Sequence, residues 1–132
     1  MTPEIPISWG ELIDKITILE IKVERMADAQ KLANVRRELI ALQVASAKAG
    51  RLPAGGGNLT AELKAINLQL WDIEDQIREL DRLGDFGPLF VELARSVYRT
   101  NDRRAQIKRE ISLLMSSDFV EEKSYAEAGP ID

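Results

Sequence analysis

Apolar residues recur every three or four positions along almost the whole chain, and this periodicity constrains the fold more than any other feature. The clearest stretch runs from Leu63 to Leu80 and keeps a strict heptad alternation. A comparable stripe runs from Leu12 to Leu42, and no segment alternates with the period of two that a half-buried strand needs. Aromatic residues make up only 5% of the chain, which favours aliphatic helix packing over a sheet sandwich. The sequence therefore predicts an all-α protein.

Capping residues and glycines divide this pattern into helices. Ser8 and Glu11 form a capping box, Asn58 is a good N-cap, and Gly87 followed by Pro88 is typical of a helix start. Glycine is unfavourable inside a helix, so the glycine-rich stretch before Asn58 is expected to be a loop. We expect helices at about residues 8–49, 58–83 and 88–116, with the glycine-rich loop at 50–57.

The number of helices depends on whether the first one is continuous. It either runs unbroken to residue 49 or breaks near Asp28, which could serve as a new N-cap; the sequence favours the continuous or mildly kinked helix. The expected fold is an antiparallel three-helix, coiled-coil-like bundle, with four helices if the break is real. Residues 1–7 are expected to form an extended arm, 8–125 a single helical domain, and 126–132 a disordered tail.

An unbroken first helix of roughly 40 residues would be about 60 Å long and would overhang the two shorter helices. The overhang would expose apolar side chains that a second copy could cover, so the sequence predicts a homodimer or a complex with another helical protein.

Composition excludes several classes of function. The chain has neither cysteine nor histidine, so it can form no disulfide, thiolate nucleophile or Ser-His-Asp triad. Carboxylate pairs such as Glu20 and Glu24 lack the histidines of di-iron bundles, and we expect no metal or cofactor. No apolar run is long enough to span a membrane, and residues 1–10 lack the features of a secretory signal. A cytoplasmic protein is the expectation, with no catalytic residue assigned.

The densest cationic run lies between Arg95 and Arg109, where Asp102 is the only acid. The stretch from Asp72 to Asp85 contains six acids and two arginines, and antiparallel packing would bring the two runs together. The favoured interpretation is an ion-pair network that sets helix register, with Arg95 and Arg99 near Asp72. The network residues proposed from the sequence, apart from those arginines, are Arg36, Asp72, Glu74, Asp75 and Asp102.

A second interpretation is a polar pocket between the helices. Thr100 and Arg104 interrupt the apolar stripe of the last helix, and Arg104 is expected to face Asn67 rather than an acid. Arginines that are not neutralised could clamp a small anion such as a carboxylate, phosphate or sugar phosphate. The predicted pocket comprises Arg25, Asn67, Arg95, Arg99, Asn101, Arg104 and Lys108.

The sequence favours a non-catalytic interaction or assembly module over these alternatives. A helical enzyme resembling the all-α chorismate mutases would need only positioning and electrostatics, but Arg25, Lys31 and the 36–38 segment do not match that family's spacing. Nucleic-acid binding through residues 95–109, with Tyr98 stacking on bases, is opposed by the net charge of −4.

Six segments together resemble a bacterial family of small proteins catalogued only as a domain of unknown function. The segments are 8–22 (SWGELIDKITILEIK), 31–35 (KLANV), 70–75 (LWDIED), 93–98 (LARSVY), 101–105 (NDRRA) and 121–125 (EEKSY). This resemblance covers nearly the whole chain and implies no activity, substrate or catalytic residue. The resemblance also indicates which residues to inspect first. These are Asp14, Lys15, Trp71, Glu74, Asp75, Arg95, Tyr98, Asn101, Asp102, Arg104 and Lys123.

Overall fold

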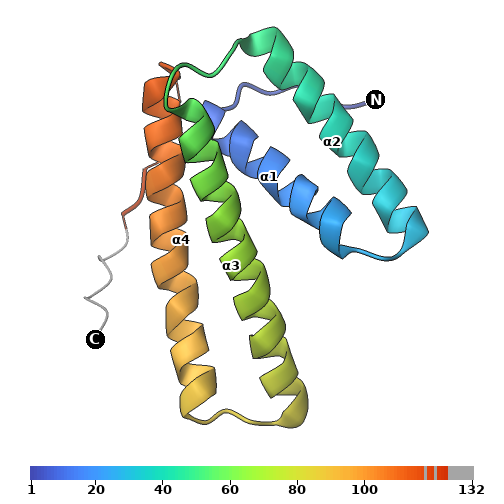
Figure 1. The fold of residues 1–132 in the computed structure, drawn as a ribbon, viewed down its shortest axis with the longest axis vertical. Coiled ribbons are helices and arrows are strands. Elements are labelled where there is room, and N and C mark those ends of the chain that lie inside the picture. Colours follow the sequence, from blue (N-terminus) through green and yellow to red (C-terminus); the bar gives the residue numbers. More distant parts are fainter. Residues whose placement is uncertain (118, 121, 125–132) are drawn as a thin grey trace.

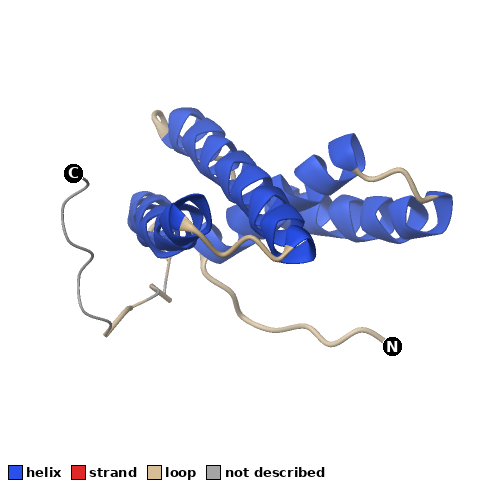
Figure 2. Cartoon of the chain, turned by 90° about the horizontal axis from the view of Figure 1, so that it is seen from below, coloured by secondary structure: helices blue, strands red, loops and turns tan. Residues whose placement is uncertain are grey.

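The computed structural model describes residues 1–117, 119–120 and 122–124, and in this part of the chain helix is the only regular structure. The predictions for residues 118, 121 and 125–132, including the disordered tail, lie outside the described residues. The four helices are α1 (Trp9–Arg25), α2 (Ala29–Ala49), α3 (Gly56–Leu83) and α4 (Pro88–Leu114). They form two antiparallel hairpins, α1–α2 and α3–α4, which cross obliquely near the start of α1 (Figures 1 and 2).

The favoured prediction of a continuous first helix is wrong, and the four-helix alternative is the one observed. The chain leaves helical geometry at Met26, whose φ and ψ are −84° and 144°. Asp28 then caps α2, because its carboxylate accepts from the backbone N–H of Lys31 at 2.8 Å. The cap satisfies a donor that the first turn would leave unpaired. As a result α2 folds back along α1 instead of extending it; coiled-coil-like packing stays a prediction.

The remaining helix ends follow local chemistry. Ser8 caps α1, Gly84 ends α3 in the left-handed conformation (φ +70°), and Pro88 starts α4, all as predicted. The start of α3 differs, because the helix begins at Gly56 rather than after Asn58. A Cβ at Gly56 would lie 2.8 Å from the Cβ of Leu52, so glycine here lets the preceding loop pack against the first turn.

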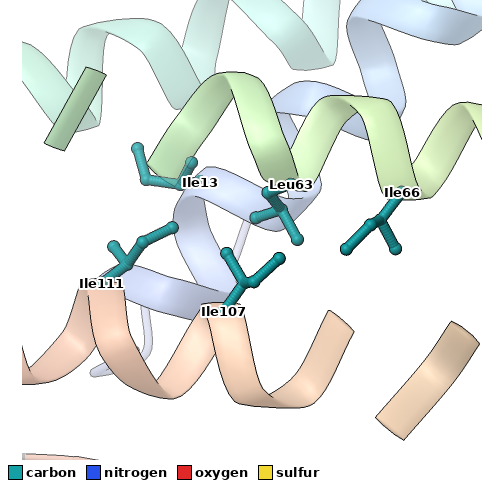
Figure 3. Close-up of a cluster of buried hydrophobic side chains, with 5 residues drawn as sticks. All are labelled: Ile13, Leu63, Ile66, Ile107 and Ile111. Carbon is teal, nitrogen blue, oxygen red and sulfur yellow. The ribbon is translucent and has the colours of Figure 1, made fainter. Parts of the chain in front are cut away.

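The hydrophobic core lies where α1 crosses the α3–α4 hairpin. Figure 3 shows Ile13 of α1 facing Leu63 and Ile66 from α3 and Ile107 and Ile111 from α4. In contrast, α2 contacts α1 but neither α3 nor α4, and none of its residues is buried in the part of the chain that is described. The first hairpin is therefore joined to the second through α1 alone.

The outer half of the α3–α4 hairpin extends well beyond this core (Figure 1). Between Trp71 and Tyr98, a stretch that the structure describes in full, Leu93 is the only buried residue. We call this stretch, residues 71–98, the distal hairpin. None of the helices, over their described residues, has the length and apolar character needed to cross a membrane.

Candidate functional site

The site begins with an unusually close approach between α1 and α4. The backbone N–H of Gly10 donates to the Ser112 hydroxyl at 2.9 Å, and that of Trp9 donates to the Ser117 hydroxyl at 3.0 Å. These donors belong to the first turn of α1 and have no partner within the helix. A Cβ at Gly10 would lie 2.1 Å from the carbonyl oxygen of Lys108. Glycine therefore permits the contact that brings the next turn of α1 against α4.

Asp14, one turn further along α1, is the centre of a buried polar network. Its side chain is only 1% exposed, and Arg104 of α4 binds both carboxylate oxygens, with Nε 2.9 Å from Oδ1 and Nη2 on Oδ2. Asn67 of α3 donates from Nδ2 to Oδ1 of Asp14 at 2.9 Å and to the Thr17 hydroxyl at 3.0 Å. Thr17 in turn donates to the Asp14 carbonyl at 2.8 Å. One carboxylate thus connects three helices.

A second ion pair lies beside this network. Lys108, which is itself buried, places Nζ 2.8 Å from a carboxylate oxygen of Glu11 and 4.0 Å from Oδ2 of Asp14. Glu11 and Asp14 carry two negative charges, and Arg104 and Lys108 carry two positive charges. The four charges therefore compensate one another, and buried charges in this arrangement orient helices rather than attract an external anion.

The structure brings together four of the seven predicted pocket residues. Asn67 and Arg104 both bind Asp14, Lys108 lies beside it, and Asn101 accepts from Arg104 Nη1 at 3.5 Å. The expectation that Arg104 would face Asn67 without an acid is wrong, because Asp14 of α1 packs against both where α1 crosses α3 and α4.

The other three predicted pocket residues lie elsewhere. Arg25 pairs with Asp72, its Nη1 3.1 Å from Oδ1, and Arg95 pairs with Glu92 within α4 at 3.6 Å. The guanidinium of Arg99 lies 5.9 Å from the centre of the Tyr98 ring, and its buried Nε has no hydrogen-bond acceptor among the described residues. These three side chains do not form a common anion site.

The predicted ion-pair network between helices is also rearranged. Neither Arg95 nor Arg99 pairs with Asp72 over the described part of the chain, and Arg36 lies on α2, which does not contact α3. The remaining members are distributed as follows: Glu74 pairs with Arg78 of the same helix at 3.6 Å, Asp102 pairs with Lys123 at 3.1 Å, and Asp75 forms no ion pair with a described residue.

An open groove of about 500 Å³ lies beside the Asp14 network, because Asn67 and Arg104, which both bind Asp14, are among the residues that line it. Its walls combine four apolar side chains with six polar or charged ones, contributed by α1, α3 and α4. The lining residues are Ile18, Ile21, Asn67, Leu70, Trp71, Glu74, Asp75, Arg78, Asn101 and Arg104. Among the described residues, no group of three or more His, Cys, Asp or Glu side chains is placed to hold a metal.

Reasoning from charge and periodicity left Glu11, Asp14 and Thr17 out of the predicted pocket. Asp14 was singled out only by the resemblance to the family of unknown function. A signal was nevertheless present, because Gly10, Asp14, Thr17 and Ile21 are spaced by four, three and four residues and therefore share one line of α1. Small and polar residues on a helix line that also carries a buried Ile21 indicate a close, polar helix contact.

Comparison with known proteins identifies a family but no activity. The model of a family of unknown function, DUF6165, matches residues 3–131, almost the whole length of the chain. No curated protein and no solved structure matches the chain.

Proposed function

The chain belongs to the DUF6165 family, whose function is unknown, and we propose that it is a non-catalytic helical assembly module that forms a homodimer through the distal hairpin. The observation that carries this proposal is the lack of cover over that segment. Its tip presents large apolar side chains that are each more than half exposed to solvent. These are Leu83, Phe86, Leu89 and Val91.

A second copy offers a natural way to bury these side chains. Two helices packed only on each other leave much of their apolar surface in water, whereas two antiparallel helical hairpins can form a four-helix bundle with one shared core. Tyr98, two turns after Val91 on the same face of α4, is also exposed and would join such a core. Coiled-coil-like packing is proposed for this interface between copies.

The charge distribution favours a copy of the same chain over an unrelated partner. Residues 72–85 contain six acids and two arginines, a net charge of −4, and residues 95–109 contain six cations and one acid, a net charge of +5. An antiparallel pairing of hairpins places the acidic run of each copy near the basic run of the other. Asp81 and Arg99 form no ion pair with described residues of their own chain, so both are available to a second copy.

Sedimentation equilibrium of the full chain tests the proposal. Leu89→Ser removes an apolar side chain that is 58% exposed at the tip, and Ile40→Ser removes one that is 60% exposed on α2, which makes it a matched control. Burial of a leucine is worth about 1.5–3 kcal/mol, and a symmetric dimer loses it twice, so Leu89→Ser is expected to weaken dimerisation at least about a hundredfold.

The Ile40→Ser control should dimerise like the unsubstituted chain, and circular dichroism should show both variants folded. A chain that remains monomeric at about 100 μM, a concentration at which weak dimers form, contradicts the proposal. Equal weakening by both substitutions contradicts the choice of surface.

A further inference from the structure

We propose that the groove beside the Asp14 network binds a linear aliphatic polyamine. This inference concerns a different surface from the dimer contact and does not depend on it. The groove runs along α3 from Asn67, near the helix crossing, to Arg78 in the distal hairpin. Two of its polar groups, a side-chain carbonyl and a carboxylate, have no partner among the described residues.

The first such group is the side-chain carbonyl of Asn67. This residue is only 6% exposed, and its Nδ2 donates to both Asp14 and Thr17. The ionised carboxylate of Asp14 can only accept, so the amide orientation is determined and Oδ1 lies on the opposite branch. No described residue donates to this oxygen, although Asn67 lines the groove. An acceptor that faces the groove without a donor from the described residues favours a ligand that brings an N–H group.

The second group is Asp75, two turns further along the same wall. The other charged lining residues have opposite charges nearby, since Arg104 binds Asp14 and Glu74 pairs with Arg78 at 3.6 Å. Asp75 lacks an ion-pair partner within the described chain, so the groove retains one uncompensated negative charge. Its preferred ligand is therefore a cation.

The spacing of these two groups determines the length of the ligand. Eight residues separate Asn67 from Asp75, and at 1.5 Å per residue they are about 12 Å apart along α3. A compact cation cannot reach both groups, whereas a triamine of comparable length can place one ammonium at each.

The apolar walls suit the methylene segments of the same molecule. Ile18 and Ile21 of α1 lie across the groove from Leu70 and Trp71 of α3. Aliphatic carbons gain from contact with this surface, and an ammonium near the indole face of Trp71 gains a cation–π attraction. The groove thus offers a group that can bind an amine at each end and an apolar path between them.

Isothermal titration of the full chain with spermidine, 1,4-diaminobutane and glutarate in about 50 mM salt tests the proposal, because low salt preserves interactions between exposed charges. We expect one spermidine per chain with submillimolar affinity, binding of the shorter diamine at least tenfold weaker, and no binding of the dicarboxylate. Asp75→Asn should weaken spermidine binding about tenfold, the usual effect of losing one charged hydrogen bond.

Glu38→Gln is the matched control, because it removes an exposed carboxylate on α2, away from the groove. Its affinity should equal that of the unsubstituted chain. Equal weakening by the two substitutions would mean general charge attraction and would overturn the inference. No heat of binding at millimolar spermidine, a diamine as tight as the triamine, or preference for glutarate would each overturn it as well.

Discussion

Removal of Arg104 should destabilise the fold far more than an ordinary surface substitution. Its guanidinium binds both oxygens of Asp14, whose side chain is 1% exposed. In Arg104→Met the carboxylate would keep one hydrogen bond from Asn67, and the Nζ atom of Lys108 would lie 4.0 Å from its Oδ2. The variant therefore leaves a buried negative charge with much of its compensation lost.

The expected loss of unfolding free energy follows from the burial of the Asp14–Arg104 pair. Breaking a buried ion pair by removing one partner costs about 3–5 kcal/mol, because the remaining charge stays desolvated. Arg104 is 26% exposed, so water can replace part of the lost contact, and the lower end of this range, about 3 kcal/mol, is expected. Since small domains are stable by about 5–15 kcal/mol, this is a large fraction of the total.

A double-mutant cycle separates the pair from its surroundings. Asp14→Leu combined with Arg104→Met removes both charges, and such replacements are often neutral or stabilising. Urea unfolding, followed by circular dichroism at one protein concentration, should show the double variant more stable than Arg104→Met alone. The reasoning is refuted if Arg104→Met costs less than about 1 kcal/mol of unfolding free energy, the typical value for an exposed pair. It is also refuted if the stability lost by the double variant equals the sum of the losses in the two single variants.

Three further predictions use the same unfolding assay. Gly10→Ala should cost about 3 kcal/mol despite the better helix propensity of alanine, because the new Cβ meets the Lys108 carbonyl at 2.1 Å; a neutral effect would contradict the close approach. Asp28→Ala should cost about 1 kcal/mol and increase amide exchange in the first turn of α2, while unchanged exchange would argue against the cap. The hydrogen bond to Glu24 raises the pKa of Lys64, so its stabilisation is present below the pKa of an unfolded lysine and lost as the pH rises through the folded value. Lys64→Met should therefore flatten the decline of stability between about pH 9 and about pH 11, and an unchanged slope would exclude this pair as its cause.

Local patterns were sufficient wherever one segment of chain decides the outcome. The helical character of α3, the Ser8 cap, the Gly84 stop and the Pro88 start depend on neighbouring residues and were predicted correctly. The break before α2 was recognised at Asp28 but not favoured, because local propensity allows both a continuous helix and a capped one. Packing of α2 against α1 accompanies the break in the folded chain.

The candidate site depended on contacts that no local pattern contains. Arg36 was expected near the acids of α3, but α2 folds along α1 and contacts neither helix of the second hairpin. Asp14 and Arg104 are 90 residues apart, and they meet because Gly10 lets α1 approach α4 closely at the oblique crossing.

The amino-acid sequence by itself determined the all-helical class, most helix ends and the polar residue in the apolar stripe of α4, because these arise from periodicity and capping within a few turns. Only the tertiary structure decided which charges are buried together and which remain open. The energy of a buried charge depends on partners and solvent exclusion that exist only once α1, α3 and α4 have packed.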